Sequence, residues 1–312
     1  MKIINYSKEY KEQWDAFVKK AKNSHFFFQR DYMEYHSDSF LDFSLIILDQ
    51  KEKIVALLPA NIKDNVLHSH QGLTFGGFLI DDKMKTEKML QIFDVLKNFL
   101  KEAGVETLIY KCIPYIYHIK PSEEDRYAFF INDAKLIRRD VTSSIDLTVQ
   151  VRYSKGRKWS VKKSQKEGVT FQESLDFSSF WILLNDVLNQ KHDTHAVHSL
   201  EEMKLLHSRF PQNIRLFLAY RNGELLAGSV VYETQTVAHT QYLANSNLGR
   251  EIGALDGLID FLIKETFKHK KYFDFGISTE SQGQELNTGL ISQKEGCGAR
   301  AIVHDFYELK FL

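Results

Sequence analysis

The chain has 312 residues, of which 43% are apolar and 26% are charged. This length allows one large domain or two ordinary ones, and the composition excludes a disordered chain. Lys and Arg together number 41, as do Asp and Glu. The zero formal charge argues against a protein whose main task is to coat nucleic acid.

Targeting and metal-binding patterns are missing from the sequence. The first residues lack the apolar core of a signal peptide, and no apolar run has the length of a membrane span. Two lone cysteines, Cys112 and Cys297, suit a reducing compartment. Neither a CxxC pair nor an HExxH motif occurs. We expect a soluble cytoplasmic protein with no metal and no membrane contact.

The first half of the chain predicts one α/β unit. Apolar residues recur at helical spacing before Gly104, which suits the position after a helix. Two helices, three strands, a helix and a strand are expected in that order, at residues 10–22, 31–37, 43–48, 54–60, 66–75, 86–103 and 106–112.

The second half predicts the same order of elements. Asn222-Gly223 between two β-rich runs is a strong hairpin signal. Two helices, three strands, a helix that starts at Gly253 and a strand are expected, with ranges 177–190, 200–210, 216–220, 225–232, 236–243 and 272–277 around that helix. Two equivalent units are the simplest explanation, with the boundary near Thr148 and domains at 1–148 and 149–312.

The turn at residues 245–254 predicts an anion site. Its glycines let backbone N–H groups converge, and the helix that follows adds its positive end, an arrangement suited to a pyrophosphate. The candidate cofactor-binding residues are Leu243, Ala244, Asn245, Gly249, Arg250, Gly253 and Ala254.

The most basic segment lies at residues 152–166, with seven Lys or Arg and no acid. Two interpretations are open. It is either the solvated face of a helix or part of a phosphate-binding site, in which Arg157 or Lys158 supplies a cation.

Several features together resemble the GNAT acyltransferase fold in its duplicated, FemABX-like form. They are the hairpin, the V-shaped strand exit, the Gly-rich turn, the helix and the following strand. The residues that carry the resemblance are 14–18, 28–29, 57–59, 69–72, Gly76-Gly77, 157–168, 273–276, 286–290 and 294–298. The resemblance implies an α/β fold of two tandem GNAT-like domains, each a mixed, mostly antiparallel sheet flanked by helices.

The resemblance also implies a function. Some members of this group transfer aminoacyl groups from tRNA to a peptidoglycan precursor, and others transfer acyl groups from acyl-CoA to a nucleotide-linked amino sugar. This chain looks more like the second kind, because it lacks a long helical arm and the segment 250–254 partly matches the acyl-CoA motif. It is similar to 3-hydroxybutyryl transferases acting on a dTDP-linked 3-amino-3,6-dideoxyhexose, with no nucleic-acid partner. An aminoacyl-tRNA ligase or a non-catalytic binding module are the alternatives.

Amide formation from a thioester needs a deprotonated amine and a stabilised oxyanion. Asp274 is the candidate proton acceptor, and the alternative is a structural carboxylate that accepts backbone hydrogen bonds or holds Lys294 or Arg300. Glu280 and Asn287, in the polar loop after residue 277, complete the catalytic candidates. The resemblance places the acceptor between the two domains. The candidate acceptor-binding residues are Gln29, Arg30, His36, His70, Arg157, Lys158 and Gln284.

Two histidine groups suggest metal binding only weakly. His68 and His70 share a strand face but lack a third ligand, so contact with substrate is favoured. His192, His195 and His198 lie in a polar stretch that is more typical of a loop between helices.

Overall fold

The computed structural model describes residues 1–192 and 196–311 and divides the chain into two compact units. The first unit comprises residues 1–141, 280–285 and 303–312, and the second comprises 142–279 and 286–302. In the part of the chain that the structure describes, no helix is long and apolar enough to cross a bilayer.

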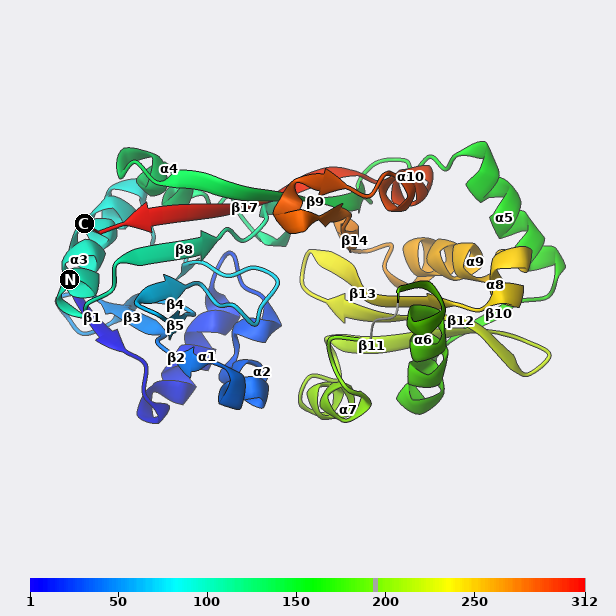
Figure 1. Cartoon of the computed structure of the whole chain (residues 1–312), viewed down its shortest axis with the longest axis horizontal. Helices are drawn as coiled ribbons and strands as arrows, with labels where there is room; N and C mark the ends of the chain where they lie inside the picture. The colour runs from blue at the N-terminus through cyan, green and yellow to red at the C-terminus, as the bar shows by residue number, and fades with distance from the viewer. Residues whose placement is uncertain (193–195, 312) are drawn as a thin grey trace. The chain divides into compact units, whose positions relative to one another are not determined.

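The first unit is an α/β layer structure (Figure 1). One sheet has the order β1-β3-β4-β7, and β17, β8, β6, β5 and β2 are neighbours in that order in another. The elements are β1 (Lys2–Asn5), α1 (Lys11–Lys20), α2 (Arg30–Met33), β2 (Leu41–Asp42), β3 (Leu45–Leu48), β4 (Ile54–Leu58), β5 (Asn61–Lys63), β6 (Val66–His68), β7 (Leu79–Ile80), α3 (Thr86–Glu102), β8 (Thr107–Lys111) and α4 (Glu124–Ile131), with 3-10 turns η1 (Lys8–Tyr10), η2 (Phe26–Phe28), η3 (Glu34–Ser39) and η4 (Tyr115–Tyr117).

The second unit holds the longest hairpin of the described chain. Its strands follow the order β10-β11-β12-β13-β14-β9. The elements are α5 (Lys155–Lys166), β10 (Thr170–Ser174), α6 (Phe177–His192), α7 (Leu200–Arg209), β11 (Ile214–Arg221), β12 (Glu224–Glu233), β13 (Val237–Asn245), α8 (Asn247–Ile252), α9 (Ala254–Phe261), the π-helical η5 (Leu262–Thr266), β14 (Tyr272–Ile277) and α10 (Thr288–Gly296).

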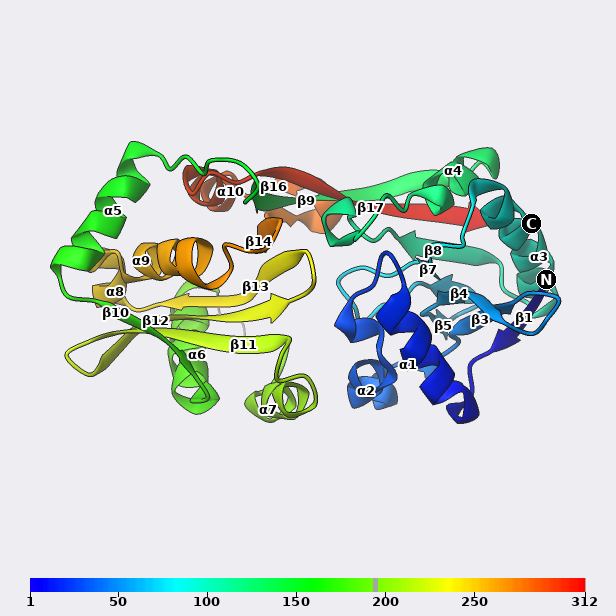
Figure 2. The same cartoon turned by 180° about the vertical axis from the view of Figure 1, so that it is seen from behind.

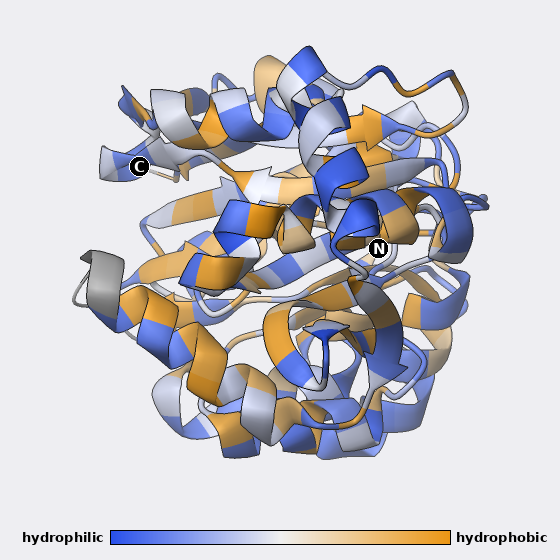
Figure 3. Cartoon of the chain, turned by 90° about the vertical axis from the view of Figure 1, so that its right-hand side faces the viewer, coloured by the Kyte–Doolittle hydropathy of each residue, from blue (hydrophilic) through white to orange (hydrophobic). Residues whose placement is uncertain are grey.

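Helix α9 lies on one face of this sheet, and α6 and α7 lie on the other, as both opposite views show (Figure 2). The apolar residues of α9 form a core with the sheet, in which Ala227, Ala238 and Phe273 are all buried. Figure 3 shows apolar and polar residues alternating along the helices that face the viewer, as expected of helices with one buried side.

The predicted hairpin is confirmed. Strands β11 and β12 pair antiparallel and are joined by Asn222-Gly223, whose φ angles are +50° and +83°. Positive φ at both central residues of a two-residue turn matches the right-handed twist of the strands, and Asn-Gly tolerates it.

The strand predicted at 66–75 is much shorter than expected. Strand β6 ends at His68, and the chain then turns so that the N–H of Leu73 donates to the carbonyl of His70. The ammonium of Lys111 binds the carbonyl oxygens of His70, Gln71 and Leu73. The single half-buried side chain of Lys111 thus satisfies three carbonyls of this turn.

The division into units differs from the predicted boundary at Thr148. Two long strands, β9 (Lys135–Asp146) and β17 (Arg300–Lys310), each contribute residues to both units. The last strand pairs with β8, with Phe306 opposite Lys111 and Lys310 opposite Thr107. Leu309 and Phe311 are buried in the core of the first unit. The C-terminal residues therefore complete the domain with which the chain begins.

Candidate active site

Strands β13 and β14 separate after three paired residues. They run parallel through Val237–Tyr272, Ala238–Phe273 and His239–Asp274. Beyond that point β13 stays paired with β12 as far as Asn245, whereas β14 pairs with β9, Ile277 opposite Thr142. The V-shaped exit predicted for this pair is confirmed.

Two local features separate these strands. The register between β12 and β13 skips Gln241, which marks a β-bulge just beyond the last parallel pair. A bulge bends its strand and increases the local twist. In β14, Gly276 has a φ of +77°, a conformation that favours glycine over other residues.

A cavity of about 370 Å³ is lined by side chains on both arms of the V, a volume typical of small-molecule sites. Leu243 and Asn245 come from β13, and Phe275 comes from β14. Apolar walls from Leu255 and Ile259 of α9 are combined with a few polar groups, which include Arg157, Arg250, Gln293 and Lys294. The cavity is therefore an apolar slot with cations in its walls.

Three of the predicted cofactor-binding residues line this cavity: Leu243, Asn245 and Arg250. Arg157, which was assigned to the acceptor, lines the same cavity and forms an ion pair with Asp256. The structure thus brings together two arginines that the sequence analysis assigned to different ligands. Lys158 is exposed on α5.

The helix predicted to start at Gly253 is α9, whose N-cap is Gly253, and a short helix, α8, which begins at Asn247, precedes it. The hydroxyl of Ser246 accepts a hydrogen bond from the N–H of Gly249 at 2.9 Å and caps α8. The N–H of Gly253 donates to the carbonyl of Gly249. The N–H of Gly249 therefore caps α8 through Ser246, and the N–H of Gly253 closes the C-terminal turn of α8, so in this structure both predicted anion-binding amides have protein acceptors.

The start of α9 packs against the backbone of α5. A Cβ added at Gly253 would lie 2.5 Å from the carbonyl oxygen of Ser160. Gly253 serves close helix packing rather than access for a phosphate. Ala244 and Ala254 are fully buried. Of the cavity cations, Arg157 is paired with Asp256 and Lys294 with the end of β14, which leaves Arg250 as the candidate for a diphosphate.

Asp274 is fully buried and satisfied by three donors. It accepts hydrogen bonds from the hydroxyl of Thr142 at 2.8 Å and from the N–H of Gly276 at 3.2 Å. Its other partner is the Nδ1 atom of His239, 2.6 Å from Oδ2. The sequence analysis missed His239, because only the parallel register of β13 and β14 brings the pair together.

The proposed partners Lys294 and Arg300 bind elsewhere. The ammonium of Lys294 donates to the carbonyls of Gly276 and Ile277 and to the hydroxyl of Ser278, each at 2.8 Å. Burial lowers the pKa of Lys294 to about 8, although Asp274 acts in the opposite direction. Arg300 donates to the carbonyl of Ala299. Lys294 therefore fixes the end of β14 beside the cavity.

The polar loop after β14 divides between the units. The side chain of Asn287 caps α10 by accepting from the N–H of Leu290 at 2.9 Å, which is a structural role. Glu280 and Gln284 are exposed in a segment of the first unit. Neither residue is among those that line the cavity, so their predicted catalytic and substrate-binding roles stay predictions.

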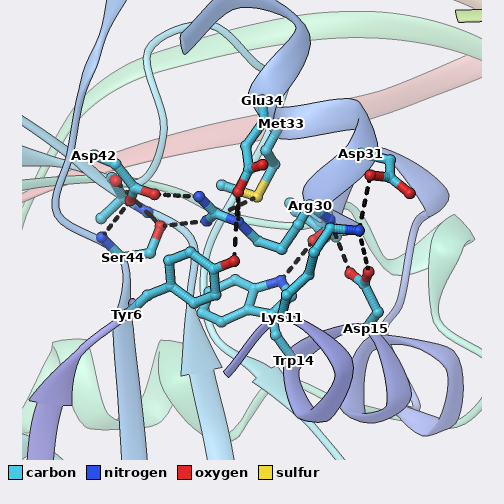
Figure 4. Close-up of polar contacts among 12 residues, drawn as sticks. Tyr6, Lys11, Trp14, Asp15, Arg30, Asp31, Met33, Glu34, Asp42 and Ser44 are labelled. Atoms are coloured by element: carbon cyan, nitrogen blue, oxygen red, sulfur yellow. Dashed lines mark hydrogen bonds and ion pairs between the residues drawn. The ribbon is translucent and has the colours of Figure 1, made fainter. Parts of the chain in front are cut away.

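Arg30 is a core residue of the first unit. Its guanidinium lies over the ring of Tyr6 at 3.7 Å and forms ion pairs with Glu34 and Asp42, as Figure 4 shows. Only 3% of Arg30 is exposed. In this structure the charge of Arg30 is taken up by Glu34 and Asp42, and its contact with a nucleotide stays a prediction. Gln29, half-buried, accepts through its carbonyl the N–H groups of Tyr32 and Met33.

His36 and His70 pack edge to face in the first unit, with ring centroids 5.6 Å apart. Burial, and next the charge of His36, lower the pKa of His70 to about 3. His70 is therefore neutral and buried, unlike a residue that faces a charged acceptor.

Metal chelation has no support among the described residues, which contain no group of three His, Cys, Asp or Glu side chains that are placed to hold an ion. His195 lies outside the described residues, and the Nδ1 atom of His198 is 2.6 Å from the hydroxyl of Tyr242.

Comparisons with known proteins identify the fold. A scan against protein-family models found no match, and a search of curated proteins found no significant relative. The structure of FemX matches with 11% identity and a TM-score of 0.69, over 98% of this chain and 97% of that one. L-PGS from Bacillus licheniformis matches with 12% identity and a TM-score of 0.63, over 98% and 93%.

A tandem GNAT protein from the clavulanic acid biosynthesis pathway matches over 100% of this chain and 98% of its own, with 9% identity and a TM-score of 0.54. The chain has the tandem GNAT, FemX-like fold. The predicted fold class is confirmed, and at these identities the likeness defines the fold alone.

Proposed function

We propose that this tandem GNAT protein is an acyl-CoA-dependent N-acyltransferase. The acyl group, acetyl or 3-hydroxybutyryl, would pass to the amino group of a nucleotide-linked sugar such as a dTDP-3-amino-3,6-dideoxyhexose. The observation that carries the proposal is the cavity in the V between β13 and β14. A thioester whose pantetheine arm enters this V has its carbonyl beside backbone groups of β13 that lack a partner strand on that side.

The lining of the cavity suits such a donor. Leu243, Leu255 and Phe275 offer apolar contact to an acyl or pantetheine chain, and Arg250 offers a cation to a phosphate. The Oδ1 atom of Asn245 is buried without a hydrogen-bond partner among the described residues. An amide N–H of a pantetheine arm is a donor of the kind that this oxygen lacks.

A thiol-release assay tests the proposal. Acetyl-CoA or 3-hydroxybutyryl-CoA is mixed with the protein and a dTDP-3-amino-3,6-dideoxyhexose, and free CoA is measured. We expect release that depends on the amino sugar and an acylated sugar in equal amount. No acceptor-dependent release with either donor would contradict the proposal and would favour a non-catalytic binding module.

An aminoacyl-tRNA-dependent ligase is the second candidate, and helix α5 favours it. The basic segment forms a 12-residue helix that leaves Lys158, Lys162 and Lys166 exposed, and Trp159 is 62% exposed. Such a surface suits a polyanion. A gel shift with charged tRNA separates the candidates, because an electrostatic complex forms at low salt and weakens steeply as salt rises.

A further inference from the structure

The pair His239–Asp274 lies at the apex of the V. These are the last paired residues of β13 and β14, so the strands diverge directly beyond them. Asp274 is fully buried, whereas the side chain of His239 is 14% exposed. A buried carboxylate thus holds an imidazole that solvent can still reach, at the point where the cavity-lining strands part.

We propose that His239 is the general base of the transfer and that Asp274 is the residue that positions it. This inference rests on the proposed function, because it names the group that takes the proton from the acceptor amine. A candidate base must be held in one orientation and one tautomer.

The surroundings of Asp274 fix the tautomer of His239. A carboxylate accepts hydrogen bonds only, so the Nδ1 atom at 2.6 Å must carry the hydrogen. The hydroxyl of Thr142 and the N–H of Gly276 also donate to Asp274, one to each oxygen, and so hold its plane. The Nε2 atom of His239 then keeps a free lone pair, which is what a proton acceptor needs.

Gly276 leaves room for the imidazole. A Cβ at this position would lie 3.3 Å from the Cε1 atom and 4.0 Å from the Nε2 atom of His239. The carbonyl of the same glycine accepts from Lys294, which lines the cavity, and Phe275 next to it lines the cavity too. The ring does not itself line the cavity, but it lies beside Gly276, one residue beyond Phe275 of the cavity wall.

The amine nitrogen of the acceptor attacks the thioester carbon and forms the C–N bond, while one N–H proton passes to Nε2 of His239. The tetrahedral intermediate then breaks its C–S bond. The thiolate of CoA leaves and takes the proton from the imidazolium, so that the products are an amide, free CoA and a neutral His239.

Three other ionisable groups define the electrostatic setting of His239. Asp274 faces it from β14, and Lys294 on α10 donates to the carbonyl of Gly276 beneath the ring. Tyr232 on β12 is its cross-strand partner. Asp274 stabilises the imidazolium that forms during the reaction, and Lys294 opposes it.

The test compares His239→Asn with His269→Asn. Asparagine keeps a donor at the position of Nδ1, so the hydrogen bond to Asp274 survives, but it has no base at the position of Nε2. His269 is an exposed histidine, with 59% of its side chain accessible, and serves as the matched control. We expect H239N to lose about 10²- to 10⁴-fold in kcat with an unchanged KM for acetyl-CoA, and H269N to match the wild type.

The pH profile separates a base from a structural residue. We expect the acid limb of kcat/KM to be present in the wild type and absent from the residual activity of H239N. An unchanged kcat and acid limb in H239N would overturn the inference while leaving the proposed function in place. A wild type that neither binds CoA nor releases thiol would overturn the proposed function and the inference with it.

A second measurement does not depend on whether a variant is active. Imidazole nitrogen NMR of the wild type at pH 8 should show His239 with its proton on Nδ1 and none on Nε2. Asp274→Asn removes the negative charge that stabilises the imidazolium, so kcat should fall by a similar factor while the amide oxygen still accepts from His239 and Gly276. A proton on Nε2 in the wild type would overturn the inference even if H239N fails to fold.

Discussion

At the scale of single residues, the structure assigns several polar side chains to different tasks from those that their sequence neighbours suggested. Arg30 was expected at a substrate and is buried against Tyr6, and Asn287 caps a helix. Conversely, Arg157 and Arg250 share one cavity. Sequence shows that a residue is charged but not which distant side chain satisfies it, so pairs such as His239–Asp274 need the sheet register.

Replacing Arg250 tests whether its positive charge binds acetyl-CoA in the cavity. Its guanidinium lines the cavity and makes one exposed hydrogen bond, to Asn247 at 3.0 Å. Arg250→Ala should therefore raise the KM and Kd for acetyl-CoA about 10-fold, the loss of one charged hydrogen bond, without changing the melting temperature. Arg221→Ala is the control, because Arg221 pairs with Glu167 and does not line the cavity. Equal affinities for the two variants would contradict the assignment.

The raised pKa of Asp125 predicts that the free energy of unfolding depends on pH. Burial raises its pKa from 3.8 to about 6, and it accepts from the hydroxyl of Tyr110 at 2.5 Å. The folded chain keeps the Asp125 proton between pH 4 and 6 where the unfolded chain releases it, so the free energy of unfolding falls as pH rises through this window. The expected loss is about 3 kcal/mol, at roughly 1.4 kcal/mol per pH unit.

Urea titrations from pH 4 to 7 measure this loss. Asp125→Asn does not titrate, so its free energy of unfolding should decline less than that of the wild type over the same range. Parallel curves for the two proteins would show that Asp125 does not hold its proton in the folded state.

At the scale of elements, the sequence predicts those helices, strands and turns that local periodicity and turn chemistry determine. The hairpin, the helix α3 and the strand β14 all lie where expected, since apolar spacing and Asn-Gly determine them locally. The start of α8 could not be predicted in this way. The turn glycines suit an open anion site as well as close helix packing, and only the position of α5 decides between them.

Replacing Gly253 distinguishes an open anion site from close packing of α9 on α5. Its φ of +77° and the nearby carbonyl of Ser160 leave no space for a methyl group. Gly253→Ala should lower the free energy of unfolding by about 2–4 kcal/mol, because it adds a contact with the main chain to the cost of a positive φ. Gly156→Ala is the control, since that glycine lies in α5 with open space around its Cα and should gain up to about 1 kcal/mol. A neutral G253A would indicate that α5 and α9 are not packed as described.

At the scale of the whole molecule, the duplicated architecture was predictable and the division of the chain was not. Each half repeats an order of helices and strands, which the sequence shows. Strand β17, by contrast, carries no local signal of its unit, and only its pairing with β8 assigns its last residues to the first. Long-range strand pairing leaves no local pattern.

Replacing Leu309 tests whether the end of β17 belongs to the first unit. It is 3% exposed and belongs to the core of the first unit although it is near the C-terminus. Leu309→Ala should lower the unfolding free energy of the first unit by about 3 kcal/mol. Fluorescence of Trp14, with Trp159 and Trp181 replaced by Phe, reports on that unit. Leu205→Ala, an exposed leucine of the second unit, is the control. An unshifted Trp14 transition in L309A would contradict the division.

Calorimetric titration of acetyl-CoA into the wild type and two variants of α10 tests the central claim most directly. Gln293 and its neighbour Ser292 are both exposed, but of the two only Gln293 lines the cavity. Gln293→Trp fills the cavity, and Ser292→Trp adds the same bulk outside it. We predict saturable binding to the wild type and to S292W and none to Q293W. Equal binding by all three proteins, or no binding to the wild type at millimolar acetyl-CoA, would contradict a donor site in the V between β13 and β14.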